Sequence, residues 1–177
     1  MRRKSLLAAL VIMVCLPTMA WSQEKPVKIG VVDSNRIIQE SAAGKKFLSA
    51  LEAQRRQKQD EITGRETKLT EDQQNYQKQM FSLSEEARSR TEKDLQQRQL
   101  ELQRIREDAD RDIRSFYTDG LTDIERKVMP IIEQVAKEMG LTLVLENAPQ
   151  RGMLFVDPSI DITDEVIARF DRAQAGT

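Results

Sequence analysis

Short apolar runs stand near both ends of the chain. Residues 27–33 (VKIGVVD) are mostly β-branched and apolar, which is typical of a β-strand. Two further runs, LTLVLE at 141–146 and GMLFVD at 152–157, are separated by NAPQR and predict a β-hairpin. Thr163 is suited to cap a last helix, DEVIARFD at 164–171, which has acidic residues in its first turn. The pattern therefore predicts three strands and a C-terminal helix.

The region between these runs, residues 42–139, is rich in Gln, Glu, Arg, Lys and Leu, a composition typical of helix. One unbroken helix of ~100 residues would be about 150 Å long, so we expect the chain to fold back on itself. Apolar residues recur every seven positions in each half, which predicts two coiled-coil stripes. The stripes consist of Leu48, Ile62, Leu69, Tyr76 and Leu83, followed by Leu95, Leu102, Ala109 and Phe116 with Ile105 and Ile113. Ser82 or Ser84, each followed by acidic residues, is suited to start the second helix, which places the turn near residues 80–84.

The predicted antiparallel arm has a sparsely apolar seam. A stable coiled coil has two apolar positions in each heptad. Here the second position of the first helix begins with Leu51 and continues with Lys58, Arg65 and Asp72. Gly64, in the middle of this helix, costs about 1 kcal/mol relative to Ala. We expect arms that are formed but pliable, with a hinge at Gly64; the alternative is an ordinary exposed hairpin without a mechanical role.

A broad apolar face follows the arm and predicts the core of a small body. It comprises Leu121, Ile124, Val128, Ile131, Ile132, Val135 and Met139. Pro130 should kink or restart the helix there. Three strands are too few to cover this face and leave open edges, so we expect copies of the chain to associate. The strand residues expected in the shared body are Ile29, Val31, Leu143, Leu145, Leu154 and Val156.

These elements define an α+β fold. The predicted β-rich body comprises residues 23–44 and 118–177, and the long antiparallel coiled-coil hairpin comprises residues 45–117. Residues 1–22 are excluded from the fold, because MRRKS followed by LLAALVIMVCLP and small residues is the pattern of a signal peptide cleaved after Ala20 or Ser22. The alternative, an uncleaved membrane anchor, is disfavoured because the apolar run is shorter than the ~20 residues that a spanning helix needs.

Charge and composition exclude several classes of function. Removal of three basic residues with the signal peptide leaves 25 basic and 29 acidic residues, a net charge of −4, with no basic excess for nucleic acid. Histidine is absent and the glycines form no phosphate-binding loop, so we expect no enzyme activity, no metal and no cofactor. Acidic clusters such as EDADRD (107–112) are interleaved with arginines and are better explained as a solvated helix face.

The chain resembles the Skp/OmpH family of periplasmic chaperones over nearly its whole length after residue 22. KIGVVDSNRIIQESAAGKK (28–46) resembles the family's opening strand and entry into the arm. VAKEMGLTLVLE (135–146) resembles its helix–Gly–strand signature, and VDPSIDITDEVIARFD (156–171) resembles its closing strand and helix. The resemblance implies a homotrimer in which strands from three subunits form a shared barrel and three helical arms enclose a cavity.

The resemblance also implies a function. Family members hold unfolded outer-membrane β-barrel proteins in this cavity without ATP, before membrane insertion. The expected protein is therefore a periplasmic holdase that binds such clients and itself, and that is not inserted stably in a membrane after cleavage. The best-known members are strongly basic, whereas this chain is acidic, so a lipopolysaccharide-binding role is not carried over.

Met80, Phe81 and Leu83 stand together at the predicted tip of an otherwise polar arm. Flexible apolar side chains there suit adaptable contact with clients, and the alternative is that they only pin the turn. A second hypothesis for the whole protein is an envelope scaffold or adaptor whose hairpin docks on a fixed partner. Such a hairpin should have a well-filled seam and larger flanking β domains, so the thin seam favours the chaperone. A hydrolase has almost no residues to support it.

Overall fold

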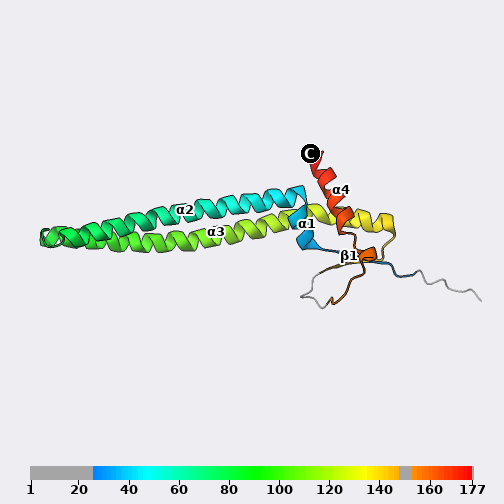
Figure 1. The fold of residues 1–177 in the computed structure, drawn as a ribbon, viewed down its shortest axis with the longest axis horizontal. Helices are drawn as coiled ribbons and strands as arrows, with labels where there is room; N and C mark the ends of the chain where they lie inside the picture. The colour runs from blue at the N-terminus through cyan, green and yellow to red at the C-terminus, as the bar shows by residue number, and fades with distance from the viewer. Residues whose placement is uncertain (1–25, 148–152, 177) are drawn as a thin grey trace, which may run out of the picture.

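A computed structural model describes residues 26–147 and 153–176. The elements, in order, are β1 (Ile29–Val32), α1 (Ser34–Glu40), α2 (Ala42–Gln79), α3 (Glu85–Met139), β2 (Leu143–Glu146), the 3-10 turn η2 (Pro158–Ile160) and α4 (Thr163–Ala175). Figure 1 shows α2 and α3 side by side as a long arm that projects from a small body. The predicted α+β class with a helical hairpin is confirmed. The predicted signal peptide lies outside the described residues.

Helix α3 belongs to both the arm and the body. It runs for 55 residues through Pro130, so the predicted restart of the helix there is wrong. A proline removes one backbone hydrogen bond, but Val128 and Val135 on either side are buried in the core and hold the flanking turns in place. The helix ends at Gly140, whose φ of 65° is the left-handed conformation that glycine adopts without a steric penalty.

The sheet differs from the one predicted. Strand β1 pairs in parallel with β2, in the register Ile29↔Leu143 to Val32↔Glu146, and a single bridge joins Val31 to Asp161 on a third segment. Residues 153–157 form no strand, so the predicted hairpin with 141–146 is wrong; residue 152 lies outside the described residues. Leu154 is 99% exposed, so within one copy no apolar burial holds this segment in an extended ladder.

The core lies where α1, α3 and α4 meet one face of the sheet. Its buried members are Val32, Ile37, Ile124, Val128, Val135, Ile162, Val166 and Phe170. Helix α4 supplies Val166 and Phe170, both completely buried, and thereby ties the C-terminal end of the chain to the helix that carries the arm. Of the apolar face predicted at the end of the long helix, Ile124, Val128 and Val135 are buried in this core and Ile131 and Ile132 pack against it, whereas Met139 is 47% exposed.

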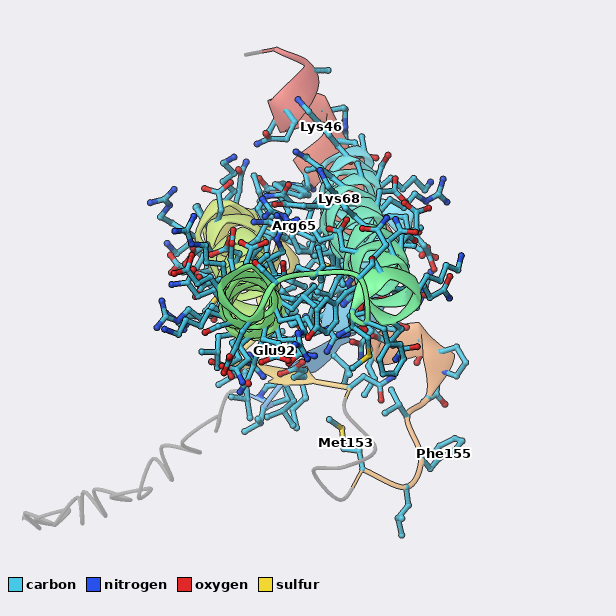
Figure 2. The ribbon with its side chains drawn as sticks, turned by 90° about the vertical axis from the view of Figure 1, so that its left-hand side faces the viewer. Lys46, Arg65, Lys68, Glu92, Met153 and Phe155 are labelled. Atoms are coloured by element: carbon cyan, nitrogen blue, oxygen red, sulfur yellow. The ribbon has the colours of Figure 1, made fainter. Side chains whose placement is uncertain are left out.

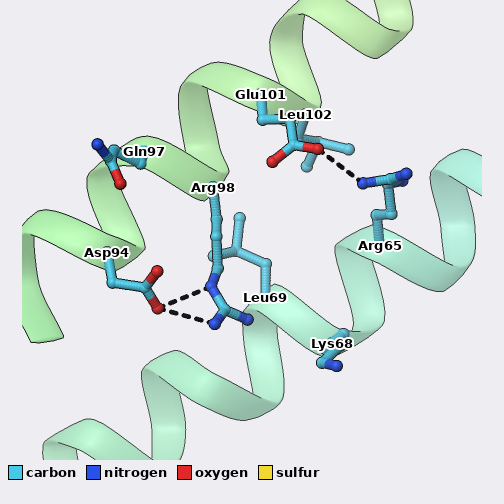
Figure 3. A pocket seen from close by; sticks show the side chains of 8 residues that line it. All are labelled: Arg65, Lys68, Leu69, Asp94, Gln97, Arg98, Glu101 and Leu102. Atoms are coloured by element: carbon cyan, nitrogen blue, oxygen red, sulfur yellow. Dashed lines mark hydrogen bonds and ion pairs between the residues drawn. The ribbon is translucent and has the colours of Figure 1, made fainter.

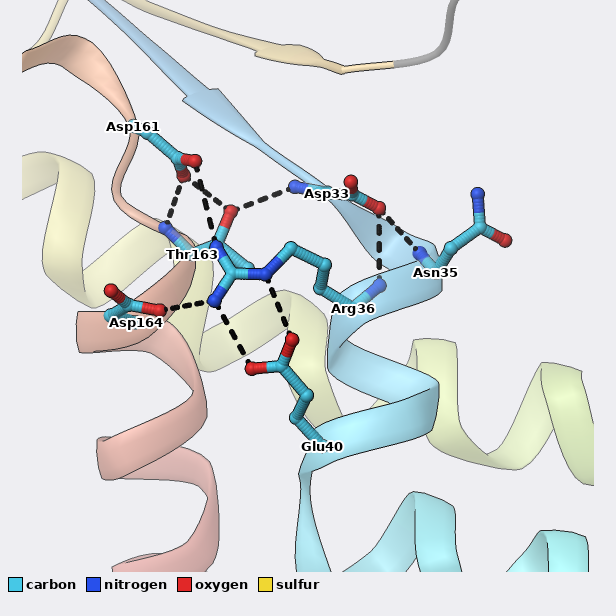
Figure 4. A network of polar contacts seen from close by, with 7 residues as sticks. All are labelled: Asp33, Asn35, Arg36, Glu40, Asp161, Thr163 and Asp164. Atoms are coloured by element: carbon cyan, nitrogen blue, oxygen red, sulfur yellow. Dashed lines mark hydrogen bonds and ion pairs between the residues drawn. The ribbon is translucent and has the colours of Figure 1, made fainter. Parts of the chain in front are cut away.

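A polar network locks α1 to α4 beside β1 (Figure 4). The Arg36 guanidinium binds Glu40 on its own helix at 2.9 Å and reaches Asp164 at 2.5 Å and Asp161 at 3.7 Å. Hydrogen bonds to Glu40 and Asp164 raise the pKa of Arg36, so the guanidinium stays charged. The fully buried Thr163 hydroxyl accepts a hydrogen bond from the Asp33 N–H at 2.9 Å, which joins the end of β1 to the start of α4.

A second cross-link connects the C-terminal end of α3 to the middle of α4. Arg169 forms ion pairs with Glu165 on its own helix and with Glu138 on α3. Its guanidinium lowers the pKa of the Glu138 carboxyl, chiefly by a direct hydrogen bond. Together with the Arg36 network, this pair fixes α4 across the base of α3.

Candidate functional site

The arm tip is a five-residue turn between α2 and α3. Helix α2 ends at Gln79, whose carbonyl accepts hydrogen bonds from the Ser82 N–H at 2.9 Å and the Ser82 hydroxyl at 2.8 Å. Ser84 caps α3, because its hydroxyl accepts from the Ala87 N–H at 3.3 Å and two glutamates occupy the first turn. The turn therefore falls where the serines predict it, with Ser84 as the cap.

The three apolar residues of the tip lie together but are unequally exposed. Phe81 is 90% exposed, whereas Met80 and Leu83 are half-buried. Half-burial of Met80 and Leu83 is what closure of the turn requires, while Phe81 contributes little to packing within its own chain. The structure places the three residues as expected, and their role in binding clients stays a prediction.

Apolar packing between the two arm helices is sparse. The buried seam residues are Leu51 and Leu69 from α2 and Leu102 and Ala109 from α3. Other members of the predicted stripes are only half-buried; they are Leu48, Ile62, Tyr76, Leu95, Ile105, Ile113 and Phe116. At roughly 1.5–3 kcal/mol for each fully buried large side chain, these contacts stabilise the hairpin only modestly.

Ion pairs between the helices supplement the apolar seam. Four of them cross from α2 to α3: Lys58–Asp112 at 2.7 Å, Arg65–Glu101 at 2.9 Å, Asp72–Arg98 at 2.8 Å and Glu66–Arg106 at 2.5 Å. Nearer the tip, the Tyr76 hydroxyl donates to the Glu92 carboxylate, which raises the pKa of Tyr76. The hydrogen bond to Asp112 likewise raises the pKa of Lys58. The four ion pairs that cross from α2 to α3 are called the charge ladder below.

The charge ladder was not predicted from the sequence. Lys58, Arg65 and Asp72 interrupt the apolar pattern of the seam, yet in the antiparallel register each of them faces an opposite charge. The signal was available in their seven-residue spacing, which puts them on one face of α2. It needed the register of α3 against α2, which fixes the partner of each residue.

A shallow hollow of about 380 Å³ lies between the arm helices at the middle of the ladder (Figure 3). It is lined by Arg65, Lys68, Leu69, Asp94, Gln97, Arg98, Glu101 and Leu102. Arg65 reaches across it to Glu101 on α3, and Arg98 pairs with Asp94 on its own helix, so the charges of the hollow largely neutralise one another. In residues 26–147 and 153–176, no group of acidic or sulfur side chains is arranged to hold a metal ion.

Gly64, the predicted hinge, is exposed and lies within the continuous helix α2. A Cβ added there would meet nothing within 4 Å, so no packing requirement explains the glycine. Its remaining physical effect is to lower the helix propensity at the centre of the arm. Bending at this position stays a prediction.

The joint between arm and body is an aromatic cluster. The Phe47 ring lies 6.1 Å from the rings of both Phe116 and Tyr117, measured between centroids. Gly120 allows Phe47 to reach the backbone of α3, since a Cβ at Gly120 would lie 2.1 Å from the Phe47 ring. This contact fixes the start of α2 against α3 at the base of the arm.

The strand residues predicted for a shared body fall into two groups. Side chains alternate along a strand, so Ile29 and Val31 lie on one face of the sheet with Leu143 and Leu145, opposite the face that bears Val32 and Val144 toward the core. Val31 is only 2% exposed, whereas the other three are at least 38% exposed. One copy therefore leaves most of this face uncovered.

Leu154 and Val156, the other two predicted strand residues, are not part of the sheet. Leu154 and Val156 lie in the irregular segment 153–157, where Leu154 is almost fully exposed and Val156 is half-buried. The predicted strand over these residues is therefore wrong.

In the described residues, no helix is both long enough and apolar enough to cross a membrane.

Comparisons with known proteins identify the family. Residues 28–170 match the family described as outer membrane protein (OmpH-like), and the chain belongs to this family. A solved structure of a protein assigned as an OmpH-like outer-membrane chaperone, from Caulobacter crescentus CB15, is similar with a TM-score of 0.76. The two sequences are 20% identical, and the match covers 83% of this chain and 85% of the other, so the likeness shows a shared fold. No curated protein matches the sequence.

The charge ladder predicts that the arm is sensitive to salt. Replacing Asp72 with Asn removes one charge from the ladder and should reduce protection of arm amides from hydrogen exchange by about 0.2–1 kcal/mol, the range for exposed ion pairs. The matched control is Asp60→Asn, which removes an exposed aspartate of the same helix that has no ion-pair partner among the described residues. The difference between the variants should vanish in 1 M NaCl, where charges are screened within ~3 Å. If the arm amides of both variants were equally protected from hydrogen exchange at low salt, the ladder would not stabilise the arm.

Gly64 in the arm and Gly120 at the joint predict different responses to alanine. Gly64→Ala should raise the free energy of unfolding by about 1 kcal/mol, because the added methyl group occupies open space and improves helix propensity. The Gly120→Ala variant should have a free energy of unfolding about 1–3 kcal/mol lower than that of the Gly64→Ala variant, because its methyl group displaces Phe47. Circular dichroism melting of both variants tests this, and equal stabilisation by the two would show that Phe47 is not held at the joint.

Proposed function

We propose that the protein is an ATP-independent holdase that binds unfolded outer-membrane β-barrel proteins in the periplasm and prevents their aggregation before insertion. Membership of the OmpH-like family supports a chaperone-type role. The observation that carries the proposal is the arm: two long helices joined by a thin apolar seam and a charge ladder, with Phe81 exposed at the free end.

The arm suits weak and adaptable binding. Exposed ion pairs contribute about 0–1 kcal/mol each, so the two helices adjust their spacing at low cost. Such an arm surrounds a client of variable shape, and its polar surface does not bind the client so strongly that release requires nucleotide hydrolysis. Met80 and Phe81 add an apolar contact at the end, where a client segment first meets the arm.

The proposed assembly is a homotrimer. Among the described residues, eleven large apolar side chains are notably exposed, and eight of them belong to the body: Val27, Ile29, Met129, Met139, Leu143, Leu145, Leu154 and Phe155. Concentrated apolar exposure marks a surface that another chain covers. Three bodies joined through this surface would direct three arms around one space, with strands of each copy in a shared barrel.

The proposed location is the periplasm. The basic start, the short apolar run and the small residues before Gln23 support cleavage and export. The processed chain lacks cysteine, since Cys15 lies within residues 1–22, so association of copies rather than disulfides would supply extra stability.

Dilution of a denatured client tests the holdase directly. The processed protein, purified from the periplasm, should suppress the turbidity of an outer-membrane β-barrel protein diluted from urea, without added nucleotide, and should form a complex of defined stoichiometry. An adaptor would leave turbidity unchanged and would bind one folded partner instead. If the client still aggregates when the processed protein is in severalfold excess, the holdase proposal is wrong.

The arm tip should contribute to client retention. Met80→Ser combined with Phe81→Ser removes apolar contacts at the tip and should weaken client binding about tenfold, equivalent to ~1.4 kcal/mol, while the body stays folded. The matched control is Leu100→Ser, which removes a 60% exposed apolar residue from the middle of the arm. Client affinity measured by fluorescence anisotropy would oppose a tip role if the double variant and the control bound equally well.

A further inference from the structure

An apolar groove runs along the body between α3 and the sheet. Its volume is about 570 Å³. It is lined chiefly by Ile37, Ile124, Val128, Met129, Ile132 and Val144, and Glu125 and Glu133 add polar groups at α3. Met129 is 51% exposed there, and several of the other residues belong to the hydrophobic core. The groove is therefore a place where the core of the body opens to solvent.

The same body carries an exposed apolar segment elsewhere. Leu154 is 99% exposed and the adjacent Phe155 is 82% exposed, so the two side chains have almost no contact with their own chain. Figure 2 shows Met153 and Phe155 on a loop that extends away from both arm helices. Burial of two such side chains is favourable, and the isolated copy forgoes that gain.

We propose that Leu154 and Phe155 of one copy fill the groove between α3 and β2 of a neighbouring copy. A groove of this size, within the range of about 300–1,000 Å³ that encloses a small ligand, accommodates two large apolar side chains. The proposal rests on the proposed homotrimer and names the contact that would hold it together. Each copy would complete the core of the next.

The arrangement of the two surfaces favours a closed ring. The groove and the segment are different parts of the body, so the contact is heterologous: each copy uses its segment on one side and its groove on the other. Repetition of such a contact about an axis closes a ring and satisfies every groove and every segment. A phenylalanine buries about 150–250 Å². A stable interface buries ~1,200–2,000 Å² in total, which is more than two side chains supply. The segment would therefore be the apolar centre of a larger contact that also includes the exposed sheet residues Ile29, Leu143 and Leu145.

Cross-linking separates a contact between copies from a contact within one copy. In the processed protein, which lacks Cys15, one variant carries Met129→Cys and another carries Phe155→Cys. Mixed and treated with a short bis-maleimide, the two variants should give a covalent dimer that neither gives alone. Met139→Cys is the matched control, because Met139 is similarly exposed on the same helix and does not line the groove; it should not cross-link to Phe155→Cys.

A chain that carries both cysteines gives the complementary result. It should form covalent dimers and trimers on a denaturing gel. A fast-migrating monomer with an internal cross-link would overturn the proposal in favour of the segment folding onto its own groove. A cross-link only to added client would overturn it in favour of a client site.

Light scattering of the unsubstituted protein distinguishes this proposal from the proposed assembly. If the unsubstituted protein is a trimer and the Met129–Phe155 cross-link does not form, the groove contact alone is overturned, whereas absence of trimers of the unsubstituted protein would overturn the proposed assembly. Suppression of client turbidity, measured on the same samples, reports the holdase activity separately.

The contact also predicts a loss of affinity between copies. Phe155→Ser should raise the dissociation constant of the oligomer at least tenfold in sedimentation equilibrium, and far-UV circular dichroism should stay unchanged because Phe155 is largely exposed in one copy. Phe81→Ser is the matched control, since it removes an equally exposed phenylalanine from the arm tip and should leave the constant unchanged. An unchanged constant for Phe155→Ser would contradict the proposal.

Discussion

The continuity of α3 is the constraint on which the rest of the structure depends. One helix, Glu85–Met139, packs against α2 in the arm and then supplies Ile124, Val128 and Val135 to the core of the body. Because no loop separates the two parts, the direction of the arm is set by how the last turns of α3 pack against β1 and α4. The cross-links made by Arg36 and Arg169 hold α4 in that arrangement.

The arm and the body are stabilised by different interactions. In the body, completely buried side chains such as Val135, Val166 and Phe170 supply the stability. Along the arm, burial is confined to a few leucines and an alanine, and opposite charges on facing helices fill the positions between them. Apolar packing resists deformation because interiors are close-packed, whereas exposed ion pairs re-form readily at altered distances. A rigid body with a deformable arm follows from this distribution and suits the proposed binding of clients of variable shape.

The body of one copy is incomplete as an isolated unit. One face of the sheet packs on the core, and on the other face Ile29, Leu143 and Leu145 are exposed. The body also has an apolar groove along α3 and an exposed apolar segment at Leu154 and Phe155. Leaving so much apolar surface in water is costly, and covering it with identical copies keeps the arms free. The proposed assembly and the proposed client binding therefore use separate parts of the same chain.

The sequence by itself determined the elements that depend on local patterns. Seven-residue spacing located both arm helices, and Ser82 or Ser84 with the acidic residues that follow located the turn, because each signal involves residues within one or two helical turns. Strand-length apolar runs on either side of the helical region extended this to the α+β fold class. The exposure of Phe81 at the tip also followed from its position in a polar turn.

Only the tertiary structure decided which distant segments meet. Strand β2 pairs with β1, more than a hundred residues away, and the segment around Leu154 stays out of the sheet, although its composition favours a strand. Lys58, Arg65 and Asp72 became ladder residues only when the register of α3 gave each of them an opposite charge. The physical reason is that strand pairing and ion pairing depend on the partner, and no local pattern in the chain specifies a partner that lies far along it.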